Sequence, residues 1–240
     1  MRKRAFWGVI AVVICVRLVS AQQVSPAEVG GQAKAPDLNT IVQSLETAEQ
    51  QNPAMAQGYT VTRSYKLFRG DETQPVSETT AEVTFIPPAT KKYVIKQASG
   101  IARGKQMVRD ILDLESVPTE SSSEFSRRNY TFVFLQQEKL GDVSTYLLRI
   151  IPKRKAKNLL NGLIWVDTTT FRIQRIEGTP TKKPSWWITN LDVMMQFTVL
   201  DGLWLPTYVT ATADVRLDGS YLLTGKDVAL QLSKSVAGQD

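Results

Sequence analysis

The chain has 240 residues, of which 42% are hydrophobic and 22% charged, a composition typical of a globular protein of one or two domains. It contains no histidine and a single cysteine. Catalytic sites built on a histidine base, and zinc or iron sites with histidine ligands, are therefore excluded. The formal net charge of +6 and the sequence pI near 9.4 would by themselves suggest an acidic partner such as a nucleic acid.

The first 21 residues predict an export signal. Basic residues at positions 2–4 precede an apolar run from Ala5 to Val16, and the segment ends in Val19-Ser20-Ala21, which has the small residues that a signal peptidase reads. We expect cleavage after Ala21 and a periplasmic mature protein. Retention of the segment as a membrane anchor is less favoured, because the apolar run is too short to span a bilayer and Arg17 interrupts it.

Removal of this segment changes the charge and the thiol content. It carries four basic residues and no acidic one, so the formal net charge falls from +6 to +2 and a nucleic-acid partner is no longer expected. Cys15 leaves with it, so the mature chain has no thiol for a disulfide or a metal. The remaining basic clusters, such as the one at 153–157, are either solvated loop tips or contacts to an anionic membrane surface.

A flexible leader is expected at 22–36, because these residues are small and polar without apolar periodicity, and a single domain is expected over 37–234. Asp37 is expected to cap a first helix that ends at Asn52-Pro53, and a second helical pattern covers 102–115. Alternating residues predict ten strands, at 59–67, 79–87, 91–97, 129–138, 143–152, 159–167, 171–178, 190–200, 204–216 and 221–232.

The turns between the last seven strands are short, so these strands are expected to form an antiparallel meander. The sequence thus predicts an α+β, mostly β domain. Its roughly ten strands form one strongly twisted sheet that curls, and two helices accompany it.

One face of the C-terminal strands is apolar and carries small residues. Either two helices fill the space over this face as an ordinary core, or the face is a concave binding surface that the small residues leave open. On the second interpretation, ligands bind along Val209 to Val215, opposite Val193 to Phe197. The predicted ligand-binding set is Phe132, Phe134, Trp165, Val193, Met195, Phe197, Val209, Ala211, Ala213 and Val215, and the predicted rim or partner-binding set is Arg63, Trp186 and Trp187.

No catalytic motif stands out. The chain has no P-loop, no glycine-rich dinucleotide turn and no serine elbow. The carboxylates Asp110, Asp113 and Glu115 are close together on the second helix, but such groups usually form a solvated face rather than an acid/base pair. We therefore expect no enzyme activity, no catalytic residues, no cofactor and no metal site.

Several motifs resemble a known family. They are Gly162–Asp167 (GLIWVD), Arg172–Gly178 (RIQRIEG), Pro184–Trp187 (PSWW), Asp201–Pro206 (DGLWLP) and Val215–Gly219 (VRLDG). Over residues 37–232 the chain resembles exported bacterial proteins of the LolA-like group, the outer-membrane lipoprotein-sorting and lipoprotein-carrier relatives.

This resemblance implies an unclosed antiparallel barrel around a hydrophobic cavity that helices cover and that holds acyl chains. LolA itself has a functional arginine beside a proline in an early strand turn. The corresponding Ile86-Pro87-Pro88 lacks it, and Arg63 is a substitute by position only.

The function expected from these features is that of a non-enzymatic periplasmic carrier of lipids or acylated lipoproteins, acting in lipoprotein sorting or envelope lipid transport. Its partners would be a lipid or the acyl chain of a lipoprotein, with transient contact to a membrane surface. The alternative is an envelope sensor or protein-interaction module similar to RseB, whose N-terminal domain resembles the same fold. In that case Trp186-Trp187 and the basic turns would bind the partner.

Overall fold

A computed structural model describes residues 37–88, 90–116, 125–183 and 185–233, with the side chains at 114 and 115 left out. The predicted export signal at 1–21, the predicted leader at 22–36 and the final residue of the predicted domain lie outside the described residues. Within the described ranges, no helix combines the length and the hydropathy that crossing a membrane requires.

Both predicted helices are present. Helix α1 spans Leu38–Gln50, and the side chain of Asp37 caps it by accepting hydrogen bonds from the backbone N–H groups of Asn39 at 2.7 Å and Thr40 at 3.1 Å. The hydrogen bonds from Thr40 and Asn39 hold the pKa of the Asp37 carboxyl below its usual value. A short 3₁₀ turn, η1 (Pro53–Met55), follows. Helix α2 spans Ala102–Glu115, the bounds that the sequence predicts.

Ten strands form one antiparallel sheet. They are β1 (Tyr59–Arg69), β2 (Ser77–Ile86), β3 (Thr90–Gly100), β4 (Tyr130–Leu140), β5 (Val143–Pro152), β6 (Leu160–Asp167), β7 (Ile173–Pro180), β8 (Ile188–Leu200), β9 (Leu203–Val215) and β10 (Gly219–Leu232).

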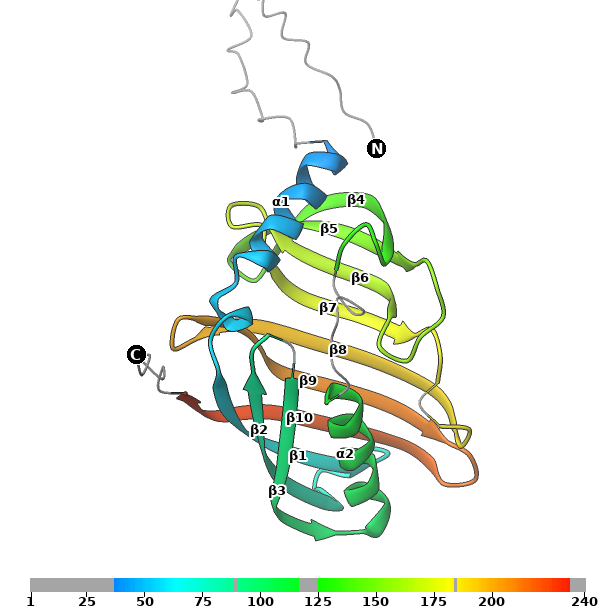
Figure 1. Cartoon of the computed structure of the whole chain (residues 1–240). Helices are drawn as coiled ribbons and strands as arrows, with labels where there is room; N and C mark the ends of the chain where they lie inside the picture. Colours follow the sequence, from blue (N-terminus) through cyan, green and yellow to red (C-terminus); the bar gives the residue numbers. More distant parts are fainter. Residues whose placement is uncertain (1–36, 89, 117–124, 184, 234–240) are drawn as a thin grey trace, which may run out of the picture. The chain divides into compact units, whose positions relative to one another are not determined.

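The strand order is β3-β2-β1-β10-β9-β8-β7-β6-β5-β4, so β4 to β10 form the predicted meander and β1 continues it by pairing with β10 (Figure 1). Strands β3 and β4 are the two edges and do not pair with each other. The predicted fold, a mostly β domain with an unclosed antiparallel sheet and two helices, is confirmed.

The sheet bends at several irregularities in strand pairing. Register shifts interrupt the pairs β1–β10, β2–β3, β4–β5, β6–β7 and β8–β9, including one at Thr62/Arg63 and one at Gln196/Phe197. An extra residue in one strand bends that strand and increases its twist, so a sheet with this many irregularities curls. On β1 every second residue from Tyr59 to Leu67 is buried, which identifies the inner face of the curl.

The two helices pack on different parts of this inner face (Figure 1). Ile41 and Leu45 of α1 belong to a core with residues of β4 to β7, such as Leu148 and Ile164. Met107, Val108 and Leu112 of α2 belong to a second core with residues of β1, β2, β9 and β10. The domain therefore has two apolar cores on one sheet, and the middle of the inner face lies between them.

A close approach of β6 and β7 explains two glycines of the family-like motifs. Gly162 and Gly178 are direct partners in the β6–β7 pair. A Cβ atom at Gly162 would lie 1.9 Å from the carbonyl oxygen of Glu177 and 2.5 Å from the Cα of Gly178. Since these are backbone atoms, a side chain at position 162 would force the two strands apart.

We therefore expect Gly162→Ala to lower the free energy of unfolding by about 1 to 3 kcal/mol, the usual cost of overpacking an interior site. Urea denaturation of the purified protein measures this value. Asn161→Ala, at the exposed neighbouring position, is the control and should change the stability little. Equal midpoints for Gly162→Ala and the unchanged protein would contradict the close-approach explanation.

Candidate ligand-binding cavity

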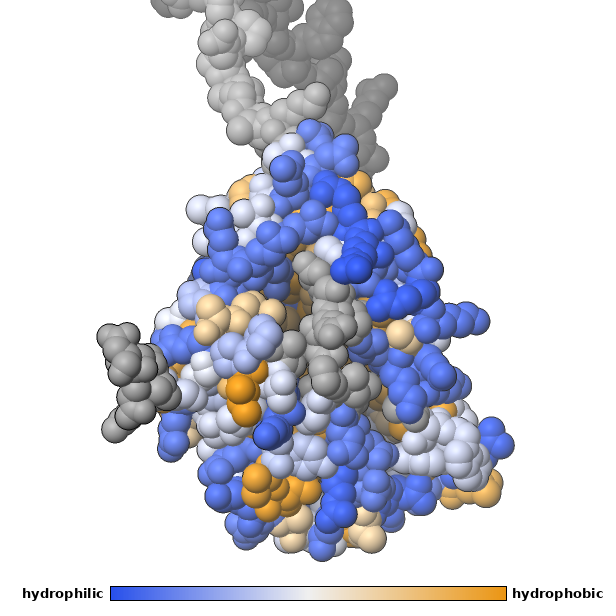
Figure 2. All heavy atoms as spheres, viewed as in Figure 1, coloured by the Kyte–Doolittle hydropathy of each residue, from blue (hydrophilic) through white to orange (hydrophobic). Residues whose placement is uncertain are grey.

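A cavity of about 370 Å³ is lined by α2, by strands β6 to β10, by one residue of β3 and by residues of the connecting loops. Most of its lining side chains are apolar, whereas polar residues cover most of the face of the molecule seen in Figure 2. Helix α1 supplies none of the lining residues. The lining comprises Lys91, Met107, Asp110, Ile111, Phe125, Lys157, Asn158, Leu160, Ile176, Pro180, Trp187, Ile188, Leu191, Val193, Met195, Phe197, Pro206, Val209, Ala211, Ala213 and Leu223.

The β8–β9 pair forms a wall of this cavity. Val193 is the direct partner of Ala211, and Met195 is the direct partner of Val209. Because side chains alternate across a strand, residues paired in this way share one face of the sheet. Ala211 and Ala213 are 7% and 0% exposed, and their side chains end at Cβ, so the wall recedes at these positions and leaves room for the cavity.

Seven residues of the two predicted sets line the cavity together. From the ligand-binding set they are Val193, Met195, Phe197, Val209, Ala211 and Ala213, and from the rim set Trp187. All but Trp187 lie on β8 and β9. The signal that identified them in the sequence was the alternation of apolar with mostly polar residues, together with the small side chains on the apolar face of β9.

Four other residues of the ligand-binding set lie elsewhere. Phe132 belongs to the core under α1, and Val215 belongs to the core under α2. Phe134 is 36% exposed beside an irregularity of β4. Trp165 lies between two residues of the α1 core in β6, and its Nε1–H donates to Glu138 Oε1 at 2.6 Å on the other face of the sheet. Strand alternation identifies a face, but it does not identify which part of that face stays open.

The predicted rim residues have three different environments. Trp186 is 81% exposed, whereas its neighbour Trp187 lines the cavity and lies under the guanidinium of Arg103, 5.5 Å from the ring centre. Arg63 is buried in the sheet and does not lie at a rim. The tandem tryptophans thus separate into one that contacts solvent and one that contacts the cavity.

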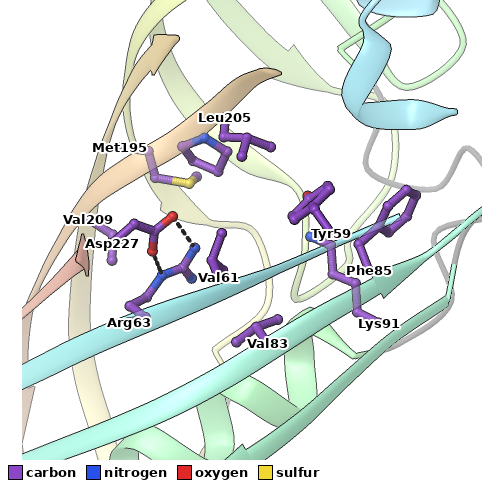
Figure 3. A pocket seen from close by; sticks show the side chains of 11 residues that line it. Tyr59, Val61, Arg63, Val83, Phe85, Lys91, Met195, Leu205, Val209 and Asp227 are labelled. Carbon is purple, nitrogen blue, oxygen red and sulfur yellow. Dashed lines mark hydrogen bonds and ion pairs between the residues drawn. The ribbon is translucent and has the colours of Figure 1, made fainter. Parts of the chain in front are cut away.

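A second cavity of about 160 Å³ adjoins the first (Figure 3). The two share four lining residues, Lys91, Met195, Pro206 and Val209. The other lining residues of the smaller cavity are Tyr59, Val61, Arg63, Val83, Phe85, Leu205 and Asp227. Unlike the larger cavity, the smaller one contains a buried ion pair.

The ion pair joins Arg63 of β1 to Asp227 of β10 (Figure 3). Arg63 Nε donates to Asp227 Oδ1 at 2.5 Å and Nη2 donates to Oδ2 at 3.4 Å, and the two side chains are 9% and 1% exposed. Arg63 Nη1 also donates to the Tyr65 hydroxyl at 3.5 Å. Taking two charges out of water costs free energy that only their mutual attraction and hydrogen bonds offset.

Asp227 was not identified in the sequence analysis. A signal was present, because Tyr221, Leu223 and Gly225 are buried at alternate positions of β10 and Asp227 continues this row. A carboxylate on the buried face of a strand needs a partner of opposite charge. Arg63 lies on the buried face of the neighbouring strand β1 and is the direct partner of Asp227.

The two described carboxylates that the sequence analysis noted on α2 each accept a hydrogen bond from a neighbouring side chain. Asp110 accepts a hydrogen bond from Gln106 Nε2 at 2.8 Å, and Asp113 accepts one from the Tyr93 hydroxyl at 2.5 Å, which raises the pKa of Tyr93. The side chain at 115 lies outside the described atoms. In the described part of the chain, no group of three or more Cys, Asp or Glu side chains could hold a metal ion.

Solved structures with similar folds include a domain of an outer-membrane lipoprotein-sorting protein from Vibrio parahaemolyticus, with 14% identity and a TM-score of 0.48. A LolA superfamily protein from Nitrosomonas europaea has 11% identity and a TM-score of 0.45, and a DUF1329 family protein from Desulfovibrio piger has 14% and 0.44. Each match covers 83% of this chain and 95% of the other.

No protein-family model matches the chain, and no curated protein matches it.

The buried ion pair leads to a stability prediction. Arg63→Leu leaves the Asp227 carboxylate buried without its cation, and we expect it to lower the free energy of unfolding by about 3 to 5 kcal/mol. Replacing both residues, as Arg63→Met with Asp227→Leu, should leave the stability near that of the unchanged protein or above it. Chemical denaturation of all three proteins checks this order, and a double variant as unstable as Arg63→Leu would contradict it.

Proposed function

We propose that this protein is an exported, non-enzymatic carrier whose larger cavity holds the acyl chain of a lipid or of an acylated lipoprotein in the periplasm. The observation that supports the proposal is the apolar cavity of about 370 Å³ beneath α2. Its volume lies within the range of about 300 to 1,000 Å³ that is usual for ligand pockets. Among the described residues, the few charged groups of its lining are Lys91, Asp110 and Lys157.

The chemistry of the lining favours a hydrocarbon ligand. Transfer of a methylene group from water into an apolar environment contributes about 0.8 kcal/mol, so a chain of several methylenes binds without any specific polar contact. An apolar cavity of this kind does not hold water well, because water needs two to four polar partners. Binding of this type needs only room and apolar walls, and the receding β8–β9 wall supplies both.

Helix α2 is the element that would have to move for entry and release. Its residues Met107 and Ile111 line the cavity. Its other attachments include polar contacts, among them the Tyr93–Asp113 hydrogen bond and the ion pair of Arg103 Nε with Asp218 Oδ2 at 2.7 Å. Exposed ion pairs of this kind contribute little to stability, so the polar contacts would be a small obstacle to displacement of α2.

A sensor or protein-interaction module remains the second proposal, and the exposure of Trp186 supports it. Lys182 and Lys183 precede this tryptophan, and Lys183 Nζ donates to the backbone carbonyl of Thr189. An exposed indole near basic side chains suits either a protein partner or an anionic membrane surface. A carrier must also reach a membrane or a partner, so this feature is compatible with both functions.

The cavity proposal predicts that Ala211→Phe abolishes binding of an apolar probe, because the new ring would project from the receding wall into the cavity. The measurement is the fluorescence of N-phenyl-1-naphthylamine, a neutral dye, titrated into the purified protein, with circular dichroism to confirm the fold. Thr212→Phe places the same ring on the exposed face of β9 and should bind like the unchanged protein. Equal binding by both variants, or no binding by the unchanged protein, would exclude the cavity as the ligand site.

A second prediction concerns contact with membranes. Trp186→Ala should weaken binding to vesicles that contain anionic phospholipid severalfold, because it removes the exposed indole from the proposed contact. Trp187→Ala is the control, since Trp187 faces the cavity. Vesicle sedimentation measures the binding. The same affinity in both variants and the unchanged protein would argue against a membrane role for Trp186 and leave the protein-partner alternative.

A further inference from the structure

A lysine lies where the two cavities meet. Lys91 is half-buried on the edge strand β3 and lines both the larger and the smaller cavity. Along β3, Lys91, Tyr93 and Ile95 are partly buried, while the alternating residues Lys92 and Val94 are exposed. Lys91 therefore belongs to the inner face of the sheet, in contrast to its neighbour Lys92.

Aromatic residues surround the stem of this lysine. Lys91 is the direct partner of Phe85 in the β2–β3 pair, and Phe85 is the direct partner of Tyr59 in the β1–β2 pair. The two rings are 5.3 Å apart, and Figure 3 shows Lys91 beside them. A long methylene stem can lie along apolar surface while its ammonium group reaches a polar site, so these rings direct the charge of Lys91 toward the cavities.

The charges around the cavities do not balance. Arg63 and Asp227 neutralise each other through their ion pair. Of the remaining lining charges, Lys157 is exposed, Asp110 is a carboxylate, and Lys91 is half-buried, which leaves a net charge of +1. Within the described part of the chain, no carboxylate forms an ion pair with Lys91. A partly desolvated cation beside an apolar cavity favours an anion as its partner.

We propose that Lys91 binds the anionic head group of a single-chain amphiphile, a carboxylate or phosphate, whose tail passes Met195 and Val209 into the larger cavity. This inference rests on the proposed function and adds the class of ligand. One chain is inferred because a cavity of about 370 Å³ lies near the lower end of ligand-pocket volumes. The shared lining residues provide the path, since Met195 and Val209 line both cavities with Lys91.

The competing explanation is protection of a sheet edge. Strand β3 is an edge of the sheet, and an inward-pointing charge on an edge strand discourages pairing with another chain. That role does not depend on the head group of a ligand. The two explanations therefore differ in whether replacing Lys91 changes the preference for anionic over neutral ligands.

The experiment measures displacement of N-phenyl-1-naphthylamine from the delipidated protein by hexadecanoate, by its methyl ester and by hexadecyl phosphate. The unchanged protein should bind the anionic ligands more tightly than the ester. Lys91→Met, which keeps most of the stem, should weaken hexadecanoate about tenfold, the usual order for loss of a charged hydrogen bond, and leave the ester unchanged. Lys91→Arg should retain the preference, and Lys92→Met, on the exposed face, is the matched control.

Each outcome has a definite meaning. If the unchanged protein binds hexadecanoate and its methyl ester with equal affinity, the role of Lys91 is overturned but the cavity proposal stands. If it binds neither these ligands nor the dye, the cavity proposal itself is overturned. Equal weakening of acid and ester by Lys91→Met, or an equal loss in Lys92→Met, also overturns the inference. If Lys91→Met does not fold, the unchanged protein decides: only the anions should bind more weakly as ionic strength rises. Displacement by only one of the two anions identifies the head group.

Discussion

Two short helices cannot cover the inner face of a ten-stranded sheet. Strands lie about 4.8 Å apart, so ten of them span roughly 43 Å before the sheet curls. Helices α1 and α2, with 13 and 14 residues, are each only about 20 Å long. Each therefore buries its apolar stripe against one group of strands, giving two cores, and an apolar cavity is left under α2 along β8 and β9.

The buried charges have a cost that the fold itself does not require. Apolar replacements of buried ion pairs are often neutral or stabilising, and a methionine at position 91 would leave no ammonium group to desolvate. Both charged features line the smaller cavity, and Lys91 also lines the larger one, whose other side chains are mostly apolar. A charged group beside an apolar cavity matches the head group and the tail of an amphiphile, the class of ligand proposed above.

The secondary structure and the meander were predictable from the sequence. The observed strand bounds differ from the predicted ones by only a few residues, because strands and turns leave local signals in the sequence. The meander was predictable because short turns can join only antiparallel neighbours. The wall formed by Val193, Met195, Ala211 and Ala213 was also predictable, since apolar residues alternate there with mostly polar ones and those of β9 are small.

Which apolar residues line the cavity, by contrast, depends on the tertiary structure. Phe132 and Ala211 both belong to apolar cores, but α1 packs over the first, whereas the second also lines the cavity under α2. The pairing of β1 with β10 joins residues more than 150 positions apart and brings Arg63 to Asp227. Local periodicity contains no information on such distant pairing or on helix placement, because both follow from how the whole sheet curls and buries its apolar surface.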